Sequence, residues 1–220
     1  MIVRRTLATA LVHAGRSRIS TRNRIIGIAF GLLWVGGCGE AVAPPETHST
    51  FSFEQGLDGW APDADACEVP PGILCAPWTI ERTADLAYEG QHALKFYMDN
   101  VIDGAVIWIV RPFPVTPGRS YEVDVSYAFA TRDWGEVNLF VLFTGVFRAP
   151  PTDLHVGTVQ EPTGNGASSD VGYRWLRKRF HAAVSGDASG VLYVVVGVWG
   201  TWETPRTYFV DDLTVQLTPD

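Results

Sequence analysis

The feature that most constrains the fold is a series of short segments, from Phe51 onward, in which hydrophobic and polar residues alternate. "STFSFE" and "HALKFYM" alternate, whereas "GAVIWIVRPFPV" and "GVLYVVVGVW" are apolar at nearly every position. Period-two alternation is typical of a strand with one buried face, and a continuous apolar run fits a strand buried on both faces. Turn sequences such as "TPGRS" and "SGDASG" separate several segments, as expected between β-strands.

Together with "YEVDVSYAFA", "EVNLFVLFTGVF", "RWLRKRFHAAV" and "TYFVDDLTVQL", these segments make about eight strands with almost no helix signal. The sequence therefore predicts an all-β fold, an antiparallel β-sandwich or jelly roll over residues 51–220. Residues 148–172 form a long polar stretch rich in Pro, Gly, Asn and Ser. A loop of that length in a compact domain is usually functional or disordered.

The first 37 residues differ from the rest. They contain six arginines and no acidic residue, and an apolar run extends from Ile25 to Val35. This run is too short to cross a bilayer and fits the hydrophobic region of a signal peptide. The following Val35-Gly36-Gly37-Cys38 resembles the lipobox of bacterial lipoproteins. We expect a lipoprotein signal peptide at 1–37 and a lipidated Cys38; the alternative is an ordinary secretory signal with a chance cysteine.

Residues 38–50 then form the lipidated cysteine and a short flexible tether, "EAVAPPETHST". Two or more acyl chains attach a protein stably to a membrane. Because Gly39 rather than an aspartate follows the cysteine, we expect the bacterial cell envelope as location, at the outer membrane or cell surface. Loss of six of the 17 basic residues against 24 acidic ones leaves a net charge of about −13. Such a charge argues against a nucleic-acid partner.

Two further cysteines, Cys67 and Cys75, flank a Pro-Gly loop in "CEVPPGILC". In an oxidising compartment they predict a local disulfide. A metal-binding pair is the alternative, although no histidine or third cysteine is near in the sequence.

Several motifs occur in an order that resembles one family. "FSFEQGLDGW" opens the domain, "AYEGQHALKF" follows, then "VTPGRSYEVDVSYAF", "RWLRKRFHAAV" and "YFVDDLTV". This order is similar to carbohydrate-binding modules of the family 4/9/22 type, within the galactose-binding-domain-like jelly rolls. The resemblance covers residues 51–217 and implies a sandwich that binds poly- or oligosaccharides. It also implies that Trp60 and Trp175 are packing residues.

The closing strand contains two adjacent aspartates, although aspartate is depleted in strands. By period two, Asp211 shares a face with Phe209 and with the core-facing Leu213, where a lone carboxylate is costly. The resemblance implies a structural Ca²⁺ that links the first strand to the last, with Glu54 and Asp211 as ligands and backbone oxygens of "EGQHA" as helpers. The alternative is that Asp211 accepts hydrogen bonds from loop amides without an ion.

Aromatic side chains on the apolar strands are the candidates for glycan binding. Sugar rings stack their C–H faces on aromatic rings, and Gly197 between two aromatics leaves room for a ligand to approach the sheet. We expect a groove with Asn138, Arg177 or Gln91 nearby. The candidate ligand-binding residues are Tyr97, Trp108, Tyr193, Trp199, Trp134 and Trp202. The alternative is that the 148–172 loop covers these aromatics, which then fill a second small core.

The sequence contains no G-x-S-x-G, no H-E-x-x-H and no Gly-rich phosphate loop. We therefore predict a protein that is not an enzyme and whose function is glycan binding at the cell surface. A structural or adhesion module that docks a protein or envelope partner is the alternative, and a glycan-active enzyme is less favoured.

Overall fold

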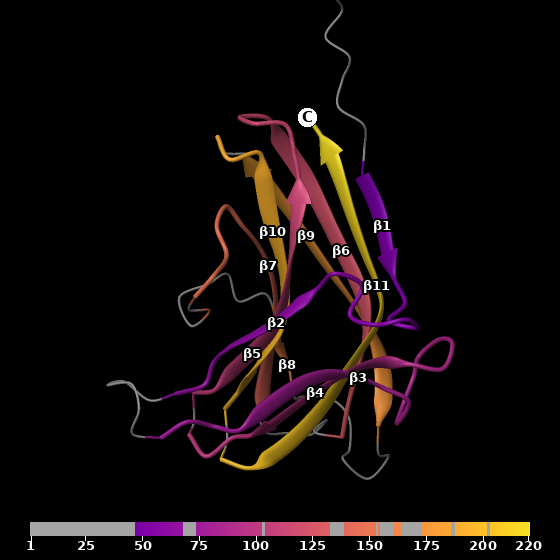
Figure 1. Cartoon of the computed structure of the whole chain (residues 1–220), viewed down its shortest axis with the longest axis vertical. Helices are drawn as coiled ribbons and strands as arrows, with labels where there is room; N and C mark the ends of the chain where they lie inside the picture. Colours follow the sequence, from indigo (N-terminus) through magenta and orange to yellow (C-terminus); the bar gives the residue numbers. More distant parts are fainter. Residues whose placement is uncertain are drawn as a thin grey trace, which may run out of the picture. The chain divides into compact units, whose positions relative to one another are not determined.

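The computed structural model describes residues 47–67, 74–102, 104–132, 139–152, 154, 161–163, 173–185, 188–201 and 203–220. The described part contains eleven strands and no helix (Figure 1). No helix that could cross a membrane occurs in that part. The signal peptide, the lipidated Cys38 and most of the expected tether lie outside the described residues.

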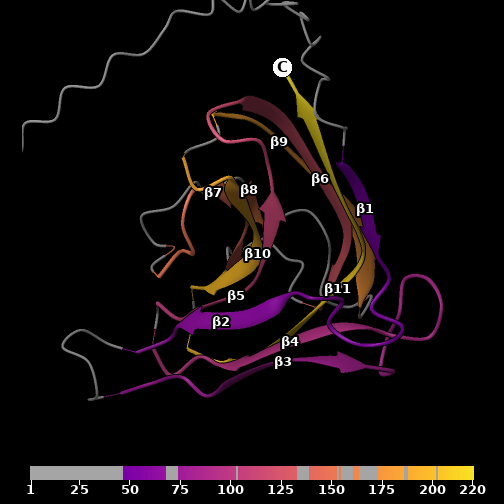
Figure 2. The same ribbon diagram turned by 45° about the horizontal axis from the view of Figure 1, so that its top comes forward.

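The strands form two antiparallel sheets that pack face to face (Figure 2). Sheet A has the order β3 (Trp78–Thr83), β4 (Ala93–Asp99), β11 (Pro205–Pro219), β6 (Ser120–Thr131) and β9 (Arg174–Ser185), and β1 (Thr47–Phe51) also pairs with β11. Sheet B has the order β2 (Ala61–Asp65), β5 (Val106–Pro114), β10 (Val191–Gly200), β7 (Phe140–Phe147) and β8 (Glu161–Thr163). The predicted antiparallel β-sandwich is confirmed.

The main core lies between the two sheets and comes from the alternation that the sequence shows. On β10, Leu192, Val194, Val196 and Val198 face inward, and on β6 every second residue from Tyr121 to Phe129 does so. Trp60 is buried beside Phe51 and Phe113, with ring centroids 5.4 and 6.3 Å away. This position agrees with the packing role expected for Trp60.

Two features near the start of the domain bear on the predictions: where strand β1 begins, and whether Cys67 and Cys75 are bonded. Strand β1 begins at Thr47 and therefore includes residues 47–50, which the sequence analysis placed in the tether. These residues pair with residues 214–217 of β11. The pairing gives their backbone N–H and C=O groups hydrogen-bond partners, which a flexible tether would lack. Cys67 and Cys75 form the predicted disulfide, with an S–S distance of 2.03 Å.

The long strand β11 changes partner in its middle. Residues 205–210 pair with β4 and residues 213–217 pair with β1, and the register with β6 shifts between Asp211 and Thr214. Asp212 lies in this bulge with a φ of 47°. A bulge inserts an extra residue and so reverses which side chains face inward.

This bulge overturns the predicted orientation of Asp211. Tyr208 and Val210 face the core before the bulge, and Leu213 and Val215 face it afterwards. Phe209 instead contacts Tyr173, at 5.1 Å between ring centroids. Asp211, two residues further on before the bulge, therefore lies with Phe209 on the outer face of sheet A.

Candidate functional site

The buried carboxylate of Asp211 holds a loop against the outer face of sheet A. Its Oδ2 accepts hydrogen bonds from the backbone N–H groups of Tyr88 (2.8 Å) and Glu89 (3.0 Å), and its Oδ1 accepts one from Asp212 (2.7 Å). Only 1% of Asp211 is exposed. Burial raises the pKa of this carboxyl group, although the three N–H donors act in the opposite direction.

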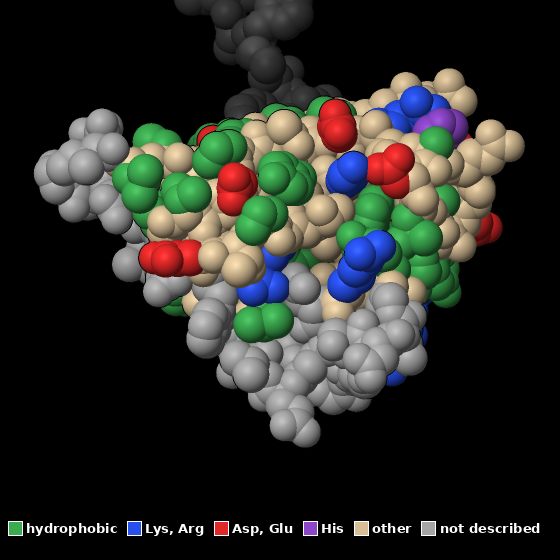
Figure 3. All heavy atoms as spheres, turned by 90° about the horizontal axis from the view of Figure 1, so that it is seen from below, with side chains coloured by type: hydrophobic (Ala, Val, Ile, Leu, Met, Phe, Trp, Pro, Cys, Tyr) green, Lys and Arg blue, Asp and Glu red, His purple; other side chains and the backbone are tan. Residues whose placement is uncertain are grey.

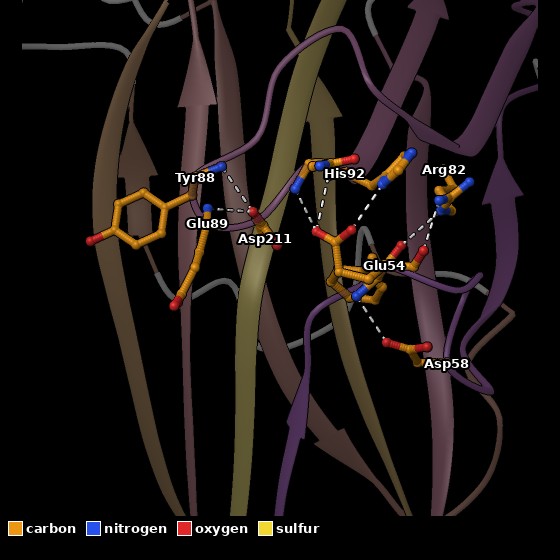
Figure 4. Close-up of polar contacts among 9 residues, drawn as sticks. Glu54, Asp58, Arg82, Tyr88, Glu89, His92 and Asp211 are labelled. Atoms are coloured by element: carbon orange, nitrogen blue, oxygen red, sulfur yellow. Dashed lines mark hydrogen bonds and ion pairs between the residues drawn. The ribbon is translucent and has the colours of Figure 1, made fainter.

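Glu54, just after β1, holds the other end of the same loop. Its Oε1 accepts the backbone N–H groups of Gln91 (2.7 Å) and His92 (3.0 Å), and its Oε2 lies 2.9 Å from His92 Nδ1. These hydrogen bonds, the one to the His92 side chain first, lower the pKa of Glu54 to about 2. We call residues 88–92, held between Glu54 and Asp211, the clamped turn (Figure 4).

Glycine is required within the clamped turn. Gly90 has a φ of 68°, in the left-handed region. A Cβ atom at this position would lie 2.1 Å from Glu54 Oε1. The turn can therefore approach the carboxylate closely only because residue 90 has no side chain.

Arg82 on β3 binds the backbone beside Glu54. Its Nε donates to the carbonyl oxygen of Phe53 (3.0 Å), and its Nη2 donates to that of Glu54 (2.7 Å). The Phe53 N–H donates to Asp58 Oδ2 at 2.9 Å, and Phe53 has a φ of 55°, which is rare for a bulky residue. The guanidinium group thus provides a cation next to two carbonyl oxygens (Figure 4).

The groups that face the carboxylates of Glu54 and Asp211 are hydrogen-bond donors, and they do not fit a calcium ion between these two residues. The oxygens of both carboxylates face N–H groups, and the clamped turn presents N–H groups where the family resemblance implied carbonyl oxygens. Within the described ranges, no group of three or more His, Cys, Asp or Glu residues could hold a metal. The contacts support the alternative in which Asp211 accepts loop amides, and calcium binding stays a prediction of the family resemblance alone.

The aromatic groove predicted from the sequence is not assembled in the described residues. Trp108 is fully buried in a second cluster with Val106, Phe143, Leu154 and Val195, on the face of sheet B that points away from the main core. Leu154 belongs to the 148–172 segment, so this part of the molecule follows the alternative of a second small core. Trp108 offers no exposed ring to a ligand.

Gly197 does not leave room for a ligand either. A Cβ atom there would lie 2.6 Å from Phe143 Cε2 and 2.7 Å from Trp108 Cβ, so neighbouring side chains already occupy the space. Tyr193 and Trp199, on the same strand, are half-buried. The sequence could not reveal this because Phe143 and Leu154 come from distant segments.

The other candidate residues lie elsewhere. Tyr97 is half-buried and belongs to β4 of sheet A, where it pairs with Thr79 and Thr207. It therefore does not share a sheet with Trp108, Tyr193 and Trp199. Trp134 and Trp202 lie outside the described residues.

The structure instead shows an aromatic surface on the outer face of sheet A, of which only Arg177 was expected from the sequence to lie near a ligand. Tyr88 is 44% exposed, and its ring meets Trp175 of β9 edge to face at 5.6 Å. The Arg177 guanidinium lies over the Tyr88 ring at 5.2 Å and bonds to Asp212 Oδ2 at 2.6 Å. We call Tyr88, Trp175, Arg177 and Asp212 the Tyr88 platform.

Trp175 was expected to be a packing residue, and the structure corrects this. It is half-buried on the outer face, because β9 alternates from the buried Phe180 so that Trp175, Arg177 and Arg179 point outward. The same alternation in "RWLRKRFH" was a signal available in the sequence. Tyr88 carried no such signal, since its position depends on the clamped turn. In Figure 4 its ring points away from the Glu54 side of the clamp.

Comparisons with known proteins bear on the fold. No family model matches the chain, and no curated protein matches it. Among solved structures, the xylan-binding domain CBM22-1 of Xyn10C from Paenibacillus barcinonensis is 16% identical, with a TM-score of 0.43 over 77% of this chain and 92% of that one. The module TmCBM61 in complex with β-1,4-galactotriose is 12% identical, with a TM-score of 0.40 over 77% and 94%.

A third solved structure is an adhesin domain rather than a carbohydrate-binding module. The K1 cleaved adhesin domain of Lys-gingipain from Porphyromonas gingivalis is 10% identical, with a TM-score of 0.43 over 79% of this chain and 99% of that one. The chain is thus similar to carbohydrate-binding modules and to an adhesin domain, and these likenesses concern the β-sandwich fold.

Proposed function

We propose that this protein is a non-catalytic glycan-binding module, carried on the bacterial cell envelope by a lipid at Cys38. The observation that supports it is the Tyr88 platform, in which an exposed aromatic ring is held in a fixed position on the sheet. Sugar rings present apolar C–H faces, which pack on aromatic rings, and hydroxyl groups, which need donors and acceptors. The platform offers both kinds of contact.

The fixed position of Tyr88 matters for affinity. Its backbone N–H is bound by Asp211 on one side of the clamped turn, and its ring is flanked by Trp175 and Arg177. A side chain already held in its binding position loses little conformational entropy when a ligand arrives. Arg177 and Asp212 supply a donor and an acceptor beside the ring, suited to sugar hydroxyl groups.

The envelope location rests on the Val35-Gly36-Gly37-Cys38 sequence and on Gly39, which follows the cysteine. Mass spectrometry of the protein from membranes tests it. A diacyl or triacyl modification at Cys38 is expected, and an unmodified mature N-terminus at another residue would refute the anchor.

Retention of the full-length protein, in detergent, on a panel of soluble and insoluble polysaccharides tests the function. We expect Tyr88→Ala to weaken binding about tenfold, the loss of one stacking contact, while the protein stays folded with a cooperative thermal transition. Trp199→Ala and Tyr193→Ala, on the face first predicted from the sequence, serve as the comparison. If these two variants lose binding and Tyr88→Ala does not, the glycan binds on sheet B instead.

If no polymer in the panel is retained, glycan binding is refuted and the adhesion role becomes the next hypothesis. A protein-docking surface usually has one continuous apolar patch. On the face seen in Figure 3, the described hydrophobic side chains occur in several groups, interspersed with acidic and basic ones. On this face the described residues thus form no single continuous apolar patch of the kind expected for a flat protein partner.

A further inference from the structure

The outward side chains of β9 continue beyond the Tyr88 platform. After Arg177, the next two are Arg179 and His181, and both are exposed. Arg177 is bound to Asp212, and His181 lies 2.9 Å from Asp124 and 3.0 Å from Glu122. Within the described part of the chain, no hydrogen bond or ion pair reaches the Arg179 guanidinium.

Arg179 lines two neighbouring cavities, which we call the Arg179 recess. The larger, of about 270 Å³, opens beside Ser126, Thr214 and Gln216 on the outer face of sheet A. The smaller, of about 130 Å³, lies on the β7 side of β9 and is also lined by Lys178 and His181. Hydroxyl and amide groups, together with the carboxylate of Asp124, thus line the larger cavity beside an arginine that forms no ion pair in the described part of the chain.

The charges around the recess differ from those of the chain as a whole. Arg179 lines both cavities, whereas Lys178 and His181 line only the smaller one; the pKa of His181 is raised chiefly by its hydrogen bond to Asp124. Asp124 is the one acidic residue in the described lining, and Glu122 lies on the far side of His181. Because His181 is already paired with both acids, the cation available at the larger cavity is the Arg179 guanidinium, which suits an anionic group.

We propose that the Arg179 recess binds the anionic group of an acidic sugar, a carboxylate or a sulfate ester, in a glycan that also stacks on the Tyr88 platform. The proposal rests on the proposed function and adds the class of glycan. Trp175 and Arg179 are four residues apart on one strand, about 13 Å, so the glycan lies along β9. A guanidinium binds carboxylate or sulfate oxygens through two parallel N–H donors.

Affinity measurements on the full-length protein with matched pairs of polymers test this proposal. Polygalacturonate is compared with its carboxyl-reduced form, and dextran sulfate with dextran, so that the two anionic groups are separated. The wild-type protein is expected to prefer at least one anionic polymer by about tenfold, the value of one charge-assisted hydrogen bond. Arg179→Gln should abolish this preference and leave binding of the uncharged partner unchanged.

Two controls separate the recess from general attraction. Arg148→Gln removes one positive charge from an exposed arginine outside the recess. Arg179→Lys keeps the positive charge of residue 179 but lacks the two parallel N–H donors of a guanidinium group. The inference is overturned if Arg148→Gln reduces the preference as much as Arg179→Gln, or if wild type binds both members of each pair equally. Absence of binding to every polymer, charged or not, would instead refute the proposed function itself.

Discussion

The clamped turn predicts an unusual sensitivity at Gly90. Alanine there would keep a φ of 68° and place a Cβ atom 2.1 Å from Glu54 Oε1 and 2.9 Å from Glu54 Cδ. The left-handed conformation costs an alanine about 1 kcal/mol, and a contact this short forces a shift that typically costs about 1–3 kcal/mol. We expect Gly90→Ala to lower the free energy of unfolding by about 3 kcal/mol in total.

Gly118 provides a matched control, because its φ is 73° and no atom lies within 4 Å of an added Cβ. Gly118→Ala should therefore show only the conformational cost, about 1 kcal/mol. For a domain of this size, about 1 kcal/mol lowers the melting temperature by roughly 2–4 °C. Thermal unfolding by circular dichroism should then show a decrease of about 6–12 °C for Gly90→Ala and about 2–4 °C for Gly118→Ala.

Equal decreases in the two variants would refute the reasoning, since they would show that the turn moves away from Glu54 without cost. The Gly90 variant also separates structure from binding. Displacement of the turn should move Tyr88, so glycan affinity should fall in Gly90→Ala and stay unchanged in Gly118→Ala.

Two further predictions concern the carboxylates of the clamped turn, and a third concerns the second hydrophobic cluster around Trp108. Because the carboxylates of Glu54 and Asp211 already accept N–H groups, a chelator should leave the melting temperature unchanged; a decrease reversed by added Ca²⁺ would instead support the calcium ion implied by the family resemblance. The pKa of Glu54 is about 2 in the folded protein and 4.5 without its partners, so its contribution to stability is present above about pH 4.5 and is lost as the pH falls toward 2. Glu54→Gln should reduce the acid sensitivity of the melting temperature in that range, and an unchanged pH profile would contradict this. Trp108→Ala should lower the free energy of unfolding by about 3–5 kcal/mol. Trp199→Ala, which truncates a half-buried side chain, should lower it clearly less when both variants are compared by thermal unfolding. Equal losses would mean that Trp199 is also part of the core.

Local patterns in the sequence were sufficient for much of the architecture. Alternation along β6 and β10 defined strands whose inward residues form the main core, because period two follows from strand geometry alone. The spacing of Cys67 and Cys75 around a Pro-Gly loop was enough to predict their disulfide. The importance of Asp211 was also visible, since a buried carboxylate in a strand needs partners, whereas Glu54 was implied only by the family resemblance.

The partners of those carboxylates could not be predicted from the sequence. Period two placed Asp211 toward the core, but the bulge at Asp212 reversed the order, and a bulge depends on the register between β11 and its neighbours. Burial of Trp108 likewise depends on Phe143 and Leu154, which come from separate segments. Contacts between distant segments form only when the sheets are assembled, so no local pattern contains them.

The sequence by itself thus determined the fold class, the inward faces of most strands and the need of Asp211 for partners. Only the tertiary structure decided which aromatic residues are exposed, because exposure depends on what other segments cover. It buried Trp108 behind Leu154 and held Tyr88 outward on the clamped turn beside Trp175. The proposed binding surface consequently lies on sheet A, on the opposite sheet from Trp108, Tyr193 and Trp199.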